Sequence, residues 1–172
     1  MIALSLPKTR EYILTNNDIL RRVRYTFDLK DSVVIDIFSL ADCAVTADQV
    51  SAWLKKEEDD TYLKMQDREL VAFLNGFINF KRGKRDGAQP VLEERLNNNM
   101  VFQKLRIALN LKAEDVLDIM ELADFRLSKH ELSAFFRKPD NKNYRECKDQ
   151  ILRKFLSGIQ LQLRPGDSEL ES

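Results

Sequence analysis

The chain has 172 residues, of which 44% are hydrophobic and 33% are charged, so it can bury a core as one domain or two small ones. Its basic and acidic residues balance at 28 each, which argues against a strongly basic nucleic-acid coat or an acidic tail. Five glycines and four prolines are few for sheets and turns and favour a mostly helical protein.

Targeting signals and cysteine usage indicate the compartment. No apolar run reaches the roughly 20 residues that a membrane-spanning helix needs. The N-terminal stretch is interrupted by Pro7 and by charges and has no signal-peptide pattern. Cys43 and Cys147 have neither zinc-site spacing nor the number for a disulfide framework, so we expect thiols packed in the interior. We therefore expect a cytoplasmic protein without a metal or cofactor.

In chain order, residues 1–15 have no counterpart elsewhere in the sequence and are predicted to be a flexible leader. A first helix then carries apolar residues at helical spacing, and a second apolar stripe covers residues 33–41. Thr46 and Gln49 have the spacing of a capping box, which predicts the start of a third helix. A fourth amphipathic helix is predicted over residues 66–80.

Residues 81–97 are predicted to be a linker, because their first part, KRGKRDGAQP, holds two glycines and a proline among charged residues. The four-helix pattern then starts again and continues to residue 163. The last residues, 164–172, are polar and are predicted to be a disordered tail.

The second half of the chain repeats the first. VIDIFSLADCAVTADQVSAWLKKE, residues 34–57, aligns without a gap with VLDIMELADFRLSKHELSAFFRKP, residues 116–139. Roughly 20 of about 65 aligned positions are identical, which implies a duplication. Ser128 and Glu131 place a second capping box at the equivalent position. The sequence predicts an all-α protein of about eight helices in two tandem pseudo-equivalent four-helix units, repeat 1 at 16–80 and repeat 2 at 98–163, whose apolar stripes pack against each other.

Charged identities between the repeats have two interpretations. Arg24 and Asp36 lie on the first two helices of repeat 1, and Arg106 and Asp118 lie at the same positions in repeat 2. We interpret each pair as an ion pair that sets how two helices cross. A duplicated ligand site is the alternative.

Two further identities have a structural interpretation. Gly76 and Gly158 fall inside helical patterns, where glycine costs about 1 kcal/mol relative to alanine. Glycine at both positions predicts that a backbone or a bulky side chain packs closely there. The asparagine pairs at 16–17 and 98–99 are interpreted as helix caps.

No catalytic motif stands out. His130, the only histidine, has no serine, cysteine or carboxylate constellation around it that would indicate a triad or a metal site. The chain lacks a glycine-rich phosphate loop and an HExxH motif. We therefore expect a protein that is not an enzyme.

The second and third helices of each repeat resemble a helix-turn-helix, although neither turn contains glycine and Asp48 would face the DNA in repeat 1. Repeat 1 has a net charge of about −4 and repeat 2 of about +3, so repeat 2 would carry any phosphate contacts. The alternative interpretation is that the basic residues of repeat 2 form an ordinary solvated surface without a ligand. The partner-binding candidates are Lys129, His130, Arg137, Lys138, Lys142, Arg145 and Lys148.

Several runs in both halves of the chain are informative beyond their helical pattern. They are NNDILRRVRY, LADCAVTADQVSAWLKKEEDD and FLNGFINFKRGK in the first half, and RLNNNMVFQKLRIALNLKAEDVLDI and ELSAFFRKPDNKNYRECKDQILRKFL in the second. Together these runs resemble the YehS-like family of uncharacterised bacterial proteins. The resemblance covers about residues 16–163. It implies a cytoplasmic, helical, duplicated bacterial protein, and it supplies no activity, substrate or catalytic residue.

These observations favour a non-catalytic binding or regulatory module that holds a macromolecular partner, either another protein or a second copy of the chain. The binding surface would be a groove between the repeats or the third helices. Nucleic-acid binding through the basic, helix-turn-helix-like second repeat is the alternative. An enzyme with a site built across the two repeats is the third possibility.

Overall fold

The computed structural model describes residues 13–167, so most of the predicted leader and the end of the predicted tail lie outside the described residues. Within this range the chain is all-α, without a strand, which confirms the predicted fold class. The helices are α1 (Asn16–Thr26), α2 (Asp31–Ser39), α3 (Ala47–Leu54), α4 (Asp67–Arg82), α5 (Asn98–Ala108), α6 (Ala113–Leu122), α7 (Lys129–Ala134) and α8 (Asp149–Leu163).

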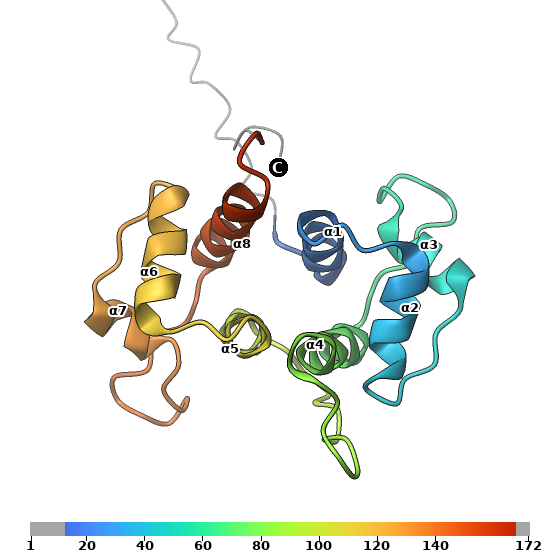
Figure 1. The fold of residues 1–172 in the computed structure, drawn as a ribbon, viewed down its shortest axis with the longest axis horizontal. Helices are drawn as coiled ribbons and strands as arrows, with labels where there is room; N and C mark the ends of the chain where they lie inside the picture. The colour runs from blue at the N-terminus through green and yellow to red at the C-terminus, as the bar shows by residue number, and fades with distance from the viewer. Residues whose placement is uncertain (1–12, 168–172) are drawn as a thin grey trace, which may run out of the picture.

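The two repeats share one core. Figure 1 shows α1, α4, α5 and α8 nearly end-on in the middle, with α2 and α3 on one side and α6 and α7 on the other. Helix α4 packs along α5, and α1 packs less extensively along α8. Buried apolar residues of both repeats form a single continuous cluster, as the predicted packing of the two apolar stripes requires.

The four central helices run in the same direction, and two carboxylates join their N-terminal ends. Asp67, the first residue of α4, accepts a hydrogen bond from Asn16 Nδ2 of its own repeat at 2.8 Å. Its other oxygen accepts from the Leu96 backbone N–H, just before repeat 2, at 3.0 Å. One carboxylate therefore holds the start of both repeats.

Asp149, the first residue of α8, makes the mirror arrangement. It accepts from Asn98 Nδ2 of its own repeat at 2.7 Å and from the Leu14 backbone N–H, just before repeat 1, at 3.0 Å. Each repeat thus gives the other the same hydrogen bond that it receives. This reciprocal pair fixes the relative position of the repeats at one end of the bundle.

The asparagine pairs are not helix caps, and that prediction is wrong. Thr15 caps α1 and Asn97 caps α5. Asn17 is buried, donates to the backbone oxygens of Trp53 and Leu63 at 2.9 and 2.8 Å, and accepts from the Met65 N–H at 2.9 Å. In repeat 2, Asn99 makes the same three hydrogen bonds: it donates to the backbone oxygens of Phe135 and Arg145 and accepts from the Cys147 N–H.

These amides satisfy backbone groups of the connection that follows α3 or α7. The chain between the third and fourth helix of each repeat has no regular secondary structure of its own. A buried asparagine supplies donors and an acceptor in one side chain. It therefore tethers this connection to the first helix of the same repeat.

Both predicted capping boxes are present. Gln49 N–H donates to Thr46 Oγ1 at 3.1 Å, and the Gln49 side chain accepts from the Thr46 N–H at 2.8 Å. Ser128 and Glu131 make the equivalent bonds at 3.0 and 3.1 Å at the start of α7. The three-residue separation in sequence was sufficient to locate both helix starts.

The glycine prediction is also confirmed. A Cβ on Gly76 of α4 would lie 1.9 Å from the carbonyl oxygen of Ile37 of α2. A Cβ on Gly158 of α8 would lie 2.1 Å from the carbonyl oxygen of Ile119 of α6. The fourth helix of each repeat therefore touches the backbone of the second, and only a residue without a side chain fits.

The predicted ion pairs Arg24–Asp36 and Arg106–Asp118 do not form. Arg24 pairs instead with Asp31, at the start of α2, with 3.1 Å between Nη2 and Oδ1. The Arg106 Nε donates to the backbone oxygen of Leu111 at 3.1 Å. The acids predicted as partners are exposed on α2 and α6: Asp36 and Asp118.

The linker was predicted over residues 81–97; its first two residues belong to α4, and residues 83–97 are attached to the bundle. Helix α4 continues to Arg82, and Gly83 follows in a left-handed conformation with φ of 94°. Leu92 and Leu96 pack against the core. Residues 164–167, predicted as tail, also make contacts, which are described below.

We expect Gly76→Ala and Gly158→Ala each to lower the free energy of unfolding by about 2 kcal/mol or more, because the added methyl group forces two packed helices apart. Urea denaturation monitored by circular dichroism measures the change. Gly166→Ala is the control, since a Cβ there meets nothing within 4 Å, and it should change stability by less than about 0.5 kcal/mol. Equal stability of all three variants would contradict the close contact.

Candidate partner-binding face

The seven residues predicted from the charge of repeat 2 lie on α7, on the connection after it and just before α8. Figure 1 places this part at the outer edge of the molecule, away from the contact between the two repeats. Three of the seven form ion pairs with nearby acids: Lys129 with Glu114 at 2.7 Å, Arg145 with Glu131 at 3.7 Å, and Lys148 with Glu146 at 3.2 Å. Part of the predicted positive charge is therefore neutralised locally.

The other four candidates differ from one another. Arg137 is half-buried, and its Nε is buried without a hydrogen-bond partner. His130, Lys138 and Lys142 are exposed and form no ion pair within residues 13–167. These three side chains are the part of the predicted basic surface that is open to a ligand.

The helix that would enter a DNA groove is short. Helix α7 has six residues, about 9 Å of helix. Its first turn uses Ser128 and Glu131 for the capping box, and the hydrogen bonds to Glu131 hold the pKa of that carboxyl below its usual value. A charged carboxylate at this position is a poor neighbour for phosphate. The helix-turn-helix interpretation stays a prediction.

A different surface lies where the C-terminal ends of α1, α4, α5 and α8 meet, and we call it the end face. It contains two neighbouring hollows of about 470 and 440 Å³. Apolar residues that line the first include Phe27, Leu109, Ile159 and Leu163. Apolar residues that line the second are Ile107, Leu111 and Phe136. Arg82 and Asn110 lie between the hollows and line both.

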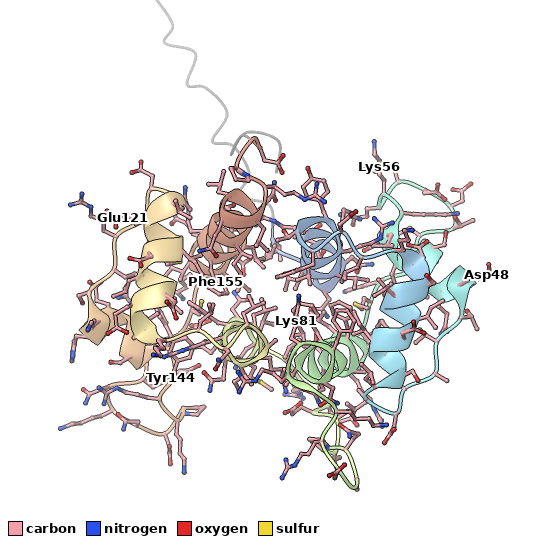
Figure 2. The ribbon with its side chains drawn as sticks, viewed as in Figure 1. Asp48, Lys56, Lys81, Glu121, Tyr144 and Phe155 are labelled. Atoms are coloured by element: carbon pink, nitrogen blue, oxygen red, sulfur yellow. The ribbon has the colours of Figure 1, made fainter. Side chains whose placement is uncertain are left out.

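Cations surround these apolar walls. The Lys81 ammonium lies 4.8 Å from the ring centroid of Phe27 and 5.8 Å from those of Phe77 and Phe80. Figure 2 shows Lys81 near the middle of the bundle. The Arg106 guanidinium lies 4.6 Å from the ring centroid of Phe136. Among the residues that the structure describes, no acidic side chain lines either hollow.

Helix geometry explains why cations gather here. The carbonyl groups at a helix C-terminus carry partial negative charge, which favours lysine and arginine in the last turn. Lys81 and Arg82 occupy the last turn of α4, and Arg106 occupies that of α5. Because the helices are parallel, their basic last turns meet at one end of the molecule.

Four of the eight large apolar side chains that are exposed within residues 13–167 lie at the same end. Tyr25, Phe80, Ile107 and Leu163 are 44%, 43%, 44% and 49% exposed, and each stands near the C-terminus of one central helix. Large exposed apolar groups next to hollows are typical of protein-binding surfaces. The sequence contained a partial signal, because Tyr25 and Ile107 are equivalent in the repeats and lie outside the core stripes.

Residues 164–167 border this surface. The Arg164 guanidinium lies 4.2 Å from the ring centroid of Tyr25. The Tyr25 hydroxyl donates to Asp167 Oδ2 at 2.9 Å, and the hydrogen bond to this carboxylate raises the pKa of the tyrosine. Residues 164–167 thus tie the end of α8 to α1.

The thiols lie in the interior to different degrees. Cys147 is buried, and desolvation, followed by the nearby charge of Asp149, raises its pKa to about 12. Cys43 is half-buried, and burial also raises the pKa of its thiol. Within residues 13–167 no cluster of histidine, cysteine or acidic side chains could hold a metal ion, and no helix is long and apolar enough to cross a membrane.

The fold and the two repeats define an all-helical protein built from one duplicated unit, and the chain belongs to the family described as Protein of unknown function (DUF1456). The family matches twice, at residues 16–83 and 98–165, which correspond to the two repeats. The Uncharacterized protein YehS of Escherichia coli (strain K12) is 45% identical over 148 residues, 85% of this chain and 94% of the relative. The resemblance to the YehS-like family is thereby confirmed. No solved structure matches the chain.

We expect Cys147 to resist an aromatic disulfide reagent at pH 8. With a pKa of about 12, only about one Cys147 side chain in ten thousand is a thiolate at that pH. In folded protein the reagent should label Cys43 first, and both thiols should react once denaturant unfolds the chain. Stopped-flow absorbance with Cys43→Ser as the control assigns the phases. Rapid labelling of folded Cys43→Ser would contradict the burial of Cys147.

Proposed function

We propose that this protein is a non-catalytic binding module whose end face holds an acidic segment of a partner protein that also carries apolar side chains. The observation that supports this function is the combination of two apolar hollows with Lys81, Arg82 and Arg106, with no acid of residues 13–167 in their lining. Since both thiols are unpaired, we place the module in the cytoplasm, a reducing compartment.

The two chemical features have separate roles in binding. Apolar side chains of the partner would fill the hollows, and burial of apolar surface contributes about 25 cal/mol per Å². Carboxylates of the partner would face Lys81, Arg82 and Arg106, which select an acidic partner and accelerate its association. Neither feature requires a catalytic group.

Charge also distinguishes a foreign partner from a second copy of this chain. Two end faces placed against each other would bring two sets of the same cations together, and like charges across an interface are unfavourable. Each cation also lies over an aromatic ring or at a helix terminus. A segment of opposite charge is therefore the better complement.

The direct test uses a fluorescein-labelled peptide of about twelve residues that alternates glutamate with leucine and phenylalanine, in a fluorescence anisotropy titration. We expect the double variant Lys81→Glu and Arg82→Glu to weaken binding at least about tenfold, because it reverses two charges of the end face. Ile107→Ser should also weaken binding, because it removes an exposed apolar contact.

The matched control is Lys138→Glu with Lys142→Glu, which makes the same charge change on the outer edge of repeat 2 and should bind the peptide like the unmodified protein. A version of the peptide with lysine in place of glutamate should not bind. Equal loss of affinity in both double variants, or no binding at tens of micromolar peptide, would refute the proposal.

Nucleic-acid binding through repeat 2 is the second candidate, favoured by the unpaired, exposed side chains of His130, Lys138 and Lys142. It predicts anisotropy changes with labelled duplex DNA or single-stranded RNA at about 50 mM salt that weaken steeply at about 200 mM. Lys138→Glu with Lys142→Glu should then lose affinity, while Lys81→Glu with Arg82→Glu keeps it. The same two double variants thus separate the candidates, because each is the control for the other.

A further inference from the structure

The contact between α4 and α5 has a balanced charge. Lys104 of α5 donates to Asn75 Oδ1 of α4 at 2.8 Å and pairs with Glu93 at 3.2 Å. The Lys104 side chain is only 14% exposed, and the Glu93 carboxylate compensates the charge that is buried there. Val71, one turn before Asn75, adds no second charge to this contact.

The duplication places an equivalent contact between α1 and α8, the two helices in the upper middle of Figure 1. Arg22 stands in the position of Lys104, and its Nη2 donates to Ser157 Oγ, in the position of Asn75, at 2.7 Å. Arg153 stands where repeat 1 has Val71. The α1–α8 contact therefore has two cations where the other has one.

No carboxylate within residues 13–167 pairs with either arginine. Asp18, whose charge acts on Arg22, already accepts from Arg21 Nη1 at 3.2 Å and from the Thr15 N–H at 3.0 Å. Asp149, one turn before Arg153, uses one oxygen for the Asn98 amide and the other for the Leu14 N–H. Both nearby acids are therefore occupied by other donors.

The arginine pair also has unused donors. Nε of Arg22 and Nη2 of Arg153 are buried without a hydrogen-bond partner. Burial lowers the pKa of Arg22, and the charge of Arg153 lowers it further. The repulsion between two like charges and the burial of N–H groups without an acceptor both destabilise the folded protein. An anion between the two arginines would relieve both effects. Both side chains are half-buried, so part of each remains in contact with solvent.

We propose that the α1–α8 contact is a binding site for a small tetrahedral oxyanion of the phosphate type. Guanidinium groups match phosphate oxygens through paired N–H donors. Arg22 and Arg153 supply these donors from two different helices, and the Ser157 hydroxyl, which accepts from Arg22, keeps its own proton to donate. Donors from three side chains suit a tetrahedral acceptor better than a planar carboxylate.

Inorganic phosphate is the probe. Thermal unfolding of the full chain, measured at constant ionic strength with chloride as the balancing anion, should show a saturable rise in Tm with phosphate. Arg153→Val, which installs the residue of repeat 1, should weaken phosphate binding at least about tenfold, because it removes charge-assisted hydrogen bonds. Ser157→Asn, the second exchange toward repeat 1, should also weaken it.

Lys142→Val is the control, because it removes an exposed cation of repeat 2 and should leave the phosphate response unchanged. In chloride alone Arg153→Val should unfold at a higher temperature than the unmodified protein, since repulsion with Arg22 is removed, and this second measurement shows that the variant is folded. The proposal would be overturned if phosphate gave no saturable rise in Tm, or if Arg153→Val showed the same rise as the unmodified protein. An equal response to acetate would overturn the choice of a tetrahedral anion.

Discussion

The contact of a helix backbone with a helix backbone at Gly76 and Gly158 is the constraint on which the rest of this fold depends. It places α2 directly on α4 and α6 directly on α8, with no room for a side chain between them. Each fourth helix is thereby covered on one side by its own repeat. Its remaining apolar surface is buried by the first helices, which completes a single core.

Local pattern was enough to predict the helices, the duplication, both capping boxes and the glycine contacts, because periodicity and cap spacing are properties of neighbouring residues. Which side chains pair with one another inside the protein was not predictable in this way. Arg24 was expected to pair with Asp36, yet it pairs with Asp31, because spacing defines the face of a helix and not the atom that a long side chain reaches. Asn17 was expected to cap a helix and instead hydrogen-bonds to the backbone of the connection that follows α3.

The predicted basic surface of repeat 2 also shows that contacts in space cannot be read from the sequence alone. Summing charges along repeat 2 highlighted Lys129 and Arg145, but the sum does not reveal that Glu114 and Glu131 lie beside them in space. The end face depends on the parallel direction of four helices that are far apart in sequence. That direction follows from long-range contacts such as Asp67 with Leu96, for which a single sequence carries no signal.

The exchange of backbone hydrogen bonds through Asp67 and Asp149 is the pattern of an isologous dimer, in which each subunit offers its twin the surface that it receives. The protein has the architecture of a homodimer whose subunits were fused into one chain. Fusion makes the association intramolecular, with an effective concentration on the order of millimolar for a short connection. It also lifts the requirement of symmetry: two identical subunits must have identical contacts, whereas fused copies can evolve Lys104 with a carboxylate on one side and Arg22 with a second arginine on the other.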